Sequence, residues 1–272
     1  MLLGAVTGAL APVTFACHPR FAGVAARLPG VVAVCGPDDA LRGPFSRVLD
    51  LHGNLRARLA AARAGGPVTR WERADLRRRW RVWAKGAPPP GVLARAAAAA
   101  GVPPTFPFWS RGPAPDTTLL LPGAAWATKR WPLAHWAGLA GRLPGRICVL
   151  GGPGEGPRVA AVAAAVGGEA VVESGFDRSF AEMARARVAV GGDTGLLHLA
   201  AAHGVPVVGL FGPTTPADGF WAHQPAGVLL GRDLPCRPCS RHGGPRCPVG
   251  DHACLADLPA DTVLGAIAAV SA

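Results

Sequence analysis

Apolar residues along this 272-residue chain gather in short runs that alternate with segments of helical period. The runs are rich in valine and leucine, as is typical of buried strands. We predict strands at residues 13–17, 31–35, 47–51, 117–121, 146–150, 170–173, 187–191 and 206–212. Helices are expected to start near Pro132, Glu155 and Arg178 and just after Asp193. Strands that alternate with helices indicate βαβ units and hence parallel sheets.

A proline-rich stretch, "PPTFPFWSRGPAPD" at 103–116, interrupts this alternation and has no usable period, so we predict a linker there. The pattern favours an α/β fold with two doubly wound, Rossmann-like domains facing a cleft. A single large Rossmann sheet is the alternative. The expected units are a first domain at 1–105, a second at 113–258 and a C-terminal helix at 259–272.

Charge is unevenly distributed between the two halves. Residues 1–110 hold 15 basic and 5 acidic residues, whereas residues 111–272 hold 13 and 12. The excess in the first half predicts an anionic partner, such as a phosphorylated or carboxylated substrate, a membrane surface or nucleic acid. An arginine-rich composition alone is the competing explanation. No nucleic-acid-binding module is recognisable, so a nucleic-acid partner is not expected.

The apolar start, "MLLGAVTGALAPVTFAC", has some features of a signal peptide. It lacks the basic residues of such a peptide, and Pro12 interrupts it. The seven cysteines are irregularly placed and do not suggest a secreted disulfide scaffold. There is no uninterrupted apolar run of membrane-spanning length. We therefore expect a cytoplasmic protein.

Candidate chemistry is clearest in "GGDTGLLHLAAA", residues 191–202, where Asp193 and Thr194 stand between a predicted strand and a predicted helix. Either side chain could simply cap the helix. The adjacent glycines, Gly191, Gly192 and Gly195, favour a second interpretation. They would let the backbone approach a ligand at a helix N-terminus, which makes a cradle for phosphate.

Two further loops follow predicted strands. "PGAAWATKRWP", at 122–132, contains Lys129, one of only two lysines, beside Thr128. A cation at a helix N-terminus opposes the helix dipole, so a bound anion would remove the conflict. A solvated helix start is the plainer alternative. In "GGPGEG", at 151–156, Glu155 could accept hydrogen bonds from ribose hydroxyls or could be a surface residue matched to the helix dipole.

A cysteine-rich segment near the end of the chain has the ligand count of a structural zinc site. Its cysteines are Cys236, Cys239, Cys247 and Cys254. An iron–sulfur centre, unbonded thiols and a local disulfide are the alternatives. The tryptophans of "RWERADLRRRWRVW", at 70–83, could stack on a sugar or lipid, but their near-helical spacing favours packing.

Four motifs occur along the chain in the order "DLHGNLRARL", "PGAAWATKRWP", "LGGPGE" and "DTGLLHLAAAHGVPVVGLFGPT". Together they resemble glycosyltransferase family 9, the ADP-heptose:lipopolysaccharide heptosyltransferases. The resemblance covers nearly the whole chain. It implies a GT-B fold and the transfer of a heptose from ADP-heptose to the lipopolysaccharide inner core or another glycan. That reaction inverts the anomeric centre and requires no metal or other cofactor. The resemblance also implies a cytoplasmic enzyme in peripheral contact with the inner membrane surface.

The resemblance also assigns roles to residues. It makes Lys129 the group that stabilises the leaving diphosphate, and it places Asn54 and Arg56 on the acceptor side. The donor-binding residues that it implies are Thr128, Lys129, Glu155, Asp193, Thr194, Gly195 and His198.

The start of the chain departs from the family pattern. Family members begin with a central strand and a Gly-Asp loop whose aspartate is the proposed base, whereas "MLLGAVTGAL" matches only the end of the helix that follows. We therefore expect the first domain to be incomplete, from a misplaced start codon or because the chain is a fragment. Asp50 and His52 have no spacing that supports them as replacement bases. A non-catalytic nucleotide-binding remnant is the second hypothesis. A dehydrogenase ranks last, because the dinucleotide-binding glycine fingerprint is missing.

Overall fold

The computed structural model describes residues 4–39, 43–71, 75–86, 88, 91–173, 175–218, 221 and 227–271. In its second half, six parallel strands form one sheet in the order β10-β9-β8-β5-β6-β7. These strands are β5 (Thr117–Leu121), β6 (Arg146–Gly151), β7 (Glu169–Val172), β8 (Ala186–Gly192), β9 (Val207–Leu210) and β10 (Gly227–Leu230). This order, which starts at β5 in the middle and proceeds to both edges, is the doubly wound arrangement. In such sheets ligands bind beyond the carboxyl ends of the strands.

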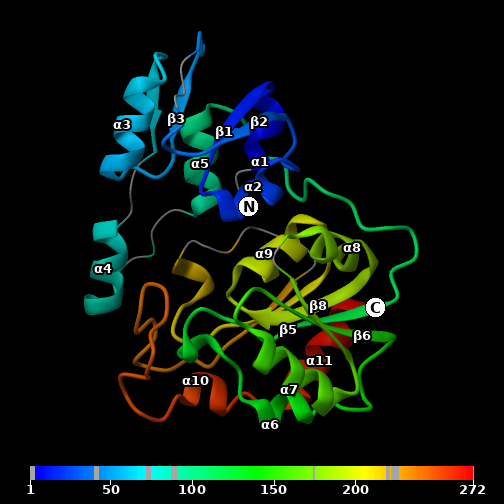
Figure 1. Ribbon diagram of the computed structural model, residues 1–272. Helices are drawn as coiled ribbons and strands as arrows, with labels where there is room; N and C mark the ends of the chain where they lie inside the picture. Colours follow the sequence, from blue (N-terminus) through cyan, green and yellow to red (C-terminus); the bar gives the residue numbers. More distant parts are fainter. Residues whose placement is uncertain are drawn as a thin grey trace.

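Helices connect these strands and cover both faces of the sheet (Figure 1). They are α6 (Leu133–Ala137), α7 (Gly156–Val166), α8 (Asp177–Arg185), α9 (Gly195–Ala202), α10 (Ala253–Ala256) and α11 (Ala260–Ser271). Short 3-10 turns are η3 (Ala127–Lys129) and η4 (Pro216–Asp218). The helices predicted after Pro132, Glu155 and Asp193 and at Arg178 are therefore all present.

The first half contains two separate parallel pairs in the described residues, β1 with β2 and β3 with β4. Their bounds are β1 (Val13–Ala16), β2 (Val31–Cys35), β3 (Val48–Asp50) and β4 (Val68–Arg70). The helices here are α1 (Gly4–Thr7), α2 (Ala22–Ala25), α3 (Leu55–Arg63), α4 (Asp75–Ala84) and α5 (Val92–Ala100), with 3-10 turns η1 (Gly8–Leu10) and η2 (Pro19–Phe21). A central strand that would join the two pairs stays a prediction.

The α/β class and the parallel sheets are confirmed, and the alternative of a single large Rossmann sheet is wrong. Two strands were not predicted. β4 is only three residues long, and β10 is a short run, "GVLL", at one edge of the large sheet. In the part of the chain that the structure describes, no helix is both long and apolar enough to cross a membrane.

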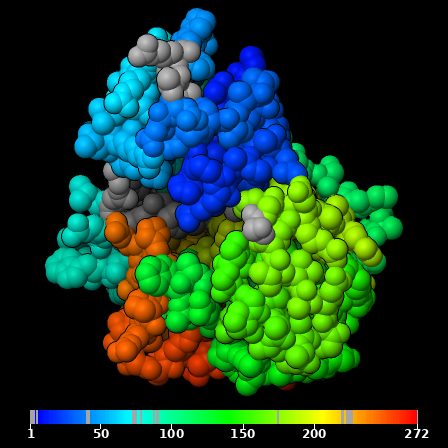
Figure 2. Space-filling model, in the orientation of Figure 1, coloured from blue at the N-terminus to red at the C-terminus, as the bar shows by residue number. Residues whose placement is uncertain are grey.

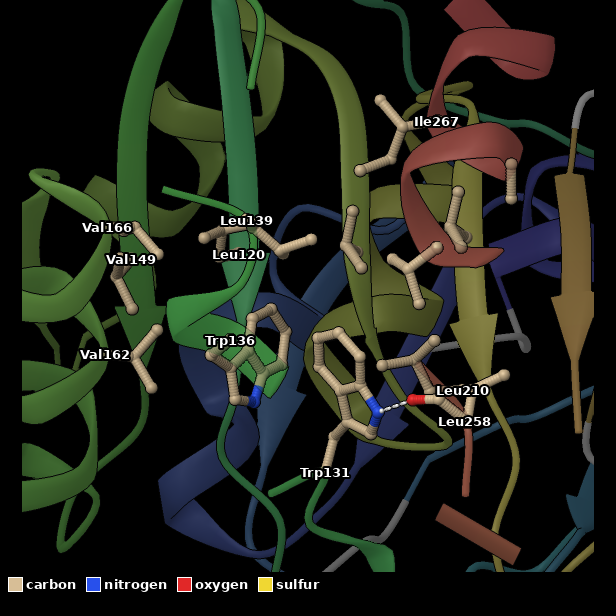
Figure 3. Packing of buried hydrophobic residues seen from close by; sticks show 14 of the residues in the cluster. Leu120, Trp131, Trp136, Leu139, Val149, Val162, Val166, Leu210, Leu258 and Ile267 are labelled. Atoms are coloured by element: carbon tan, nitrogen blue, oxygen red, sulfur yellow. Dashed lines mark hydrogen bonds between the residues drawn. The ribbon is translucent and has the colours of Figure 1, made fainter. Parts of the chain in front are cut away.

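One face of the large sheet packs on α6, α7 and α11 around two buried tryptophans (Figure 3). Trp131 and Trp136 meet edge to face, with ring centroids 5.0 Å apart. The indole Nε1 of Trp131 donates a hydrogen bond to the carbonyl of Leu258, 2.9 Å away, so its polar atom is satisfied inside the core. This cluster fixes the segment that immediately follows Lys129.

The predicted linker at 103–116 has no helix or strand, but it is not a solvated tether. Phe106 and Trp109 pack against the second core cluster of the large sheet. The indole of Trp109 lies 4.8 Å from the ring of Phe180 and 4.7 Å from that of His203. Val24 of α2 joins the same cluster, so the first half contributes to the core beneath the second.

The packing interpretation is wrong for two tryptophans of α4, because Trp80 and Trp83 are 58% and 79% exposed. Trp71, just before the helix, instead lies beside the guanidinium of Arg95, which is 4.5 Å from its ring centroid. Residues 72–74 of that motif lie outside the described residues.

Candidate functional site

The loop between β8 and α9 carries an uncapped helix N-terminus. Thr194 occupies the cap position in extended backbone, but its side chain makes no capping hydrogen bond. The Asp193 side chain does not cap the helix either, because its carboxylate bonds elsewhere. Gly195, the first residue of the helix, is exposed. The capping interpretation is therefore not what the structure shows, and the first-turn N–H groups receive no side-chain cap.

Lys129 lies beside this helix start. Its ammonium is 2.6 Å from Oδ2 of Asp193 and 3.0 Å from the backbone carbonyl of the same residue. The two side chains are only 13% and 6% exposed. The ammonium, held by Asp193, and the uncapped helix start thus lie at one point, and both are groups that can bind a phosphate.

Two further side chains hold the Asp193 carboxylate. The Thr214 hydroxyl donates to Oδ2 over 2.9 Å, and Nε2 of His198 lies 3.3 Å from Oδ1. Burial raises the pKa of Asp193, but the hydrogen bond from His198 and the charge of Lys129 outweigh it and hold the pKa far below its ordinary value. Asp193 is therefore ionised across the physiological range. Among the described residues, the buried Nδ1 atom of His198 has no hydrogen-bond partner.

The two glycines before Asp193 lie close to neighbouring segments of the protein's own backbone. The expectation was that they would let a ligand approach. Gly191 and Gly192 both belong to β8. A Cβ on Gly192 would come within 2.8 Å of the carbonyl oxygen of Lys129, and one on Gly191 within 2.9 Å of that of Leu121. Their small size lets the Lys129 loop lie directly against β8, which brings the lysine to Asp193.

Glu155 lies where the loops after β5 and β6 meet. Its carboxylate accepts the N–H of Gly152 at 2.8 Å, and a Cβ on Gly123 would come within 2.1 Å of its Oε2. Arg158, one turn further into α7, donates to the carbonyl of Pro122 over 2.7 Å. Glu155 therefore borders the same edge of the sheet as Lys129, and its contact with a ribose stays a prediction.

The cysteine-rich segment holds the loops of the site in place through hydrogen bonds. This structural role was not predicted from the sequence. The Thr128 hydroxyl and the backbone of Gly244 exchange hydrogen bonds at 2.9 Å, so Thr128 already has partners, and its contact with a ligand stays a prediction. The half-buried guanidinium of Arg237 donates to the carbonyls of Phe211, Gly212 and Thr214. One segment thus fixes both the Lys129 loop and the loop that carries Thr214. These hydrogen bonds join residues more than 20 positions apart, so no local motif could have indicated them.

The four cysteines of that segment form no disulfide. Burial raises the pKa of the Cys254 thiol to about 11, so it is protonated at neutral pH. Within the described ranges, no three or more His, Cys, Asp or Glu side chains are arranged to hold a metal ion. A metal bound by Cys236, Cys239, Cys247 and Cys254 thus gains no support from the geometry and stays a prediction.

The two acceptor-side residues lie in the first half, and both already have partners. Asn54 caps α3, with its Oδ1 accepting the N–H of Ala57 at 2.8 Å, and Arg56 forms an exposed ion pair with Asp38. Their contact with an acceptor is untested. Asp50 is buried and accepts the N–H groups of His52 and Gly53, so its Oδ1 stabilises a turn. That arrangement gives no support for Asp50 as a base.

The strand order, with a lysine–aspartate pair at the carboxyl edge of the sheet, defines an α/β protein of the Rossmann type. Among solved structures, the chain is similar to a glycosyl transferase of family 9 from Veillonella parvula (19% identity, TM-score 0.66, covering 100% of this chain and 95% of that one). It is also similar to E. coli heptosyltransferase WaaC with ADP-2-deoxy-2-fluoro heptose (19% identity, TM-score 0.68, covering 98% and 94%). At this identity the likeness shows the shared GT-B fold.

Sequence comparison gives the family. The model for "Glycosyltransferase family 9 (heptosyltransferase)" matches residues 98–246, more than half of the chain. The chain therefore belongs to glycosyltransferase family 9. It is 42% identical over 130 residues to lipopolysaccharide heptosyltransferase 1 of Pseudomonas aeruginosa, a match that covers 44% of this chain and 35% of the relative. A match to lipooligosaccharide heptosyltransferase 2 of Campylobacter jejuni has 36% identity over 73 residues and covers 26% and 22%. The matched regions thus span about a third or less of these relatives.

Thr214→Val is expected to destabilise the protein by about 1–3 kcal/mol. The buried, charged carboxylate of Asp193 would lose the hydrogen bond that the Thr214 hydroxyl donates. Valine matches threonine in shape, so packing is preserved. Urea unfolding measures the effect, and Thr214→Ser, which keeps the hydroxyl, should restore most of the stability. A Thr214→Val protein as stable as the wild type would show that this hydrogen bond contributes nothing.

Proposed function

We propose that the chain transfers a heptose or related sugar from ADP-heptose to a lipopolysaccharide inner-core or other glycan acceptor, with inversion at the anomeric carbon. The observation that carries the proposal is the Lys129–Asp193 pair beside the uncapped start of α9. The family membership and the nucleotide-sugar analogue named for WaaC support the choice of donor.

Charge development explains why this arrangement suits the reaction. Cleavage of the sugar–phosphate bond leaves negative charge on the departing diphosphate. The ammonium of Lys129 and the N–H groups at Thr194 and Gly195 would stabilise that charge as it grows. Asp193 and Thr214 hold the lysine in place before the donor arrives. No metal ion is needed for this role in the proposal.

The remaining roles follow the positions of the side chains. Glu155 would accept hydrogen bonds from the donor ribose, and His198 would contact the donor beside Asp193. The basic first half would face an acidic glycan or glycolipid acceptor at the cytoplasmic side of the inner membrane. The acceptor hydroxyl must also lose a proton to a base, which we do not assign to any residue of this chain.

The test is a pair of measurements on the whole chain. Thermal unfolding with ADP, UDP, GDP and NAD should show stabilisation by ADP above the others, because a ligand that binds only the folded state raises the melting temperature. ADP-heptose and a deacylated core acceptor should then yield a heptosylated product. ADP binding without transfer would favour the non-catalytic remnant. A melting temperature that none of the four nucleotides raises would contradict the donor site itself.

A further inference from the structure

Helix α4 has its polar and apolar faces reversed with respect to an ordinary surface helix. Leu76, Trp80 and Trp83, at spacings of four and three residues, share one face, and all three point to solvent. Leu76 and Trp83 are each 79% exposed, and the two indole rings lie 5.6 Å apart. A helix that packs on a core normally turns such a stripe inward.

The opposite side of the helix is anchored by polar contacts with the second half of the chain. Nε of Arg81 lies 2.8 Å from Oδ1 of the buried Asp218. Just past the helix, the ammonium of Lys85 donates to the carbonyls of Cys236 and Pro238, each at 2.8 Å. These contacts fix the rotation of α4 about its axis, so the outward direction of the tryptophans follows from the fold.

Basic residues border the apolar stripe. Arg77 and Arg79 are exposed on either side of it. Together with Leu76, Trp80, Trp83 and Pro88 they line an open surface hollow. Figure 2 shows the teal residues of α4 projecting from the side of the molecule, next to the orange cysteine-rich segment. The stripe is therefore exposed to solvent at the side of the molecule.

The chemistry of this face fits the surface of a bilayer that contains anionic lipid. Tryptophan rings are favoured at the boundary between headgroups and acyl chains, and arginine side chains can extend along apolar surface to reach lipid phosphates. An in-plane helix with an aromatic and leucine face and a basic border binds by apolar burial plus attraction to anionic headgroups. The net charge of +10 over residues 1–110 adds to that attraction.

We infer that α4 is a membrane-docking helix that inserts Leu76, Trp80 and Trp83 into the headgroup region of an anionic bilayer. The inference rests on the proposed function in one respect, since a glycolipid acceptor would be presented at such a surface. The geometry of α4 itself does not depend on that function. The contacts of Arg81 and Lys85 transmit the orientation of α4 to the second half of the chain, which carries the donor site.

Co-sedimentation with vesicles tests the inference directly. The wild-type chain should bind vesicles of phosphatidylethanolamine and phosphatidylglycerol in equal parts, and should bind phosphatidylcholine vesicles much more weakly. Raised salt should weaken the first interaction, because it screens the arginine–phosphate attraction. Trp80→Ser/Trp83→Ser should lower the affinity by about tenfold or more, since two of the three apolar anchors are lost.

Val249→Ser is the matched control, because it removes an exposed apolar side chain of the second half, and it should bind vesicles like the wild type. The double variant should retain ADP binding and transfer to a deacylated acceptor. Wild-type binding to vesicles without any transfer would overturn the proposed function and leave this inference intact. Unchanged vesicle affinity in the double variant would overturn the inference. So would light scattering that shows a wild-type dimer and a monomeric variant, because a second copy would then cover α4.

Discussion

Lys129→Met is expected to weaken ADP binding by about tenfold to a hundredfold and to destabilise the folded protein by about 3–5 kcal/mol. The affinity falls because the proposed partner of the diphosphate is gone. The stability falls because Asp193, only 6% exposed, keeps its charge but loses its cation. Isothermal titration with ADP and urea unfolding measure the two effects separately.

A second variant separates the two causes. Lys129→Met/Asp193→Leu removes the charge and its partner together, so much of the stability should return while ADP affinity stays low. Arg142→Met is the control, since it removes a cation whose partner, Asp261, is largely exposed, and it should change neither quantity appreciably. If Lys129→Met binds ADP like the wild type, the diphosphate role of Lys129 is wrong.

Trp131→Ala is expected to lower the free energy of unfolding by about 3–5 kcal/mol, because it empties the centre of the cluster in Figure 3 and leaves the Leu258 carbonyl without its donor. ADP affinity should also fall, since Trp131 fixes the chain two residues after Lys129. Urea unfolding followed by circular dichroism measures the stability.

Trp83→Ala makes the same substitution at an exposed position and should change stability by no more than about 0.5 kcal/mol. Trp131→Phe keeps most of the buried volume and should lie between the two alanine variants. Equal stabilities for Trp131→Ala and Trp83→Ala would mean that the cluster around Trp131 does not hold the second half together.

The inner strands of the large sheet, β5, β6, β8 and β9, were predictable because they are largely buried. Such strands appear in the sequence as nearly continuous apolar runs, for example "TTLLL" at β5 and "RVAVG" within β8. β4 and β10 were not predicted; both lie at sheet edges and are only partly buried. The tryptophans of α4 misled for another reason: helical spacing shows that residues share a face but not which way that face points.

The donor-site prediction found the elements but not the contacts between them. A lysine and an aspartate that each follow a strand were expected at the same edge, and the structure places them 2.6 Å apart. Their supports, Thr214 and Arg237, were not assigned from the sequence, because each acts through a contact with a residue distant in sequence. The glycines were correctly expected to allow close approach, but the approaching group is the chain's own backbone.

The packing of Trp109 and the ion pair of Arg81 have a consequence for autonomous folding. Trp109 covers Phe180 and His203, and Arg81 neutralises the buried Asp218, yet both lie upstream of residue 113. A polypeptide that began at residue 113 would uncover an aromatic surface and leave the buried Asp218 without its cation. Upstream residues thus complete the packing around the sheet that carries the donor site. The two halves are therefore expected to unfold as one cooperative unit.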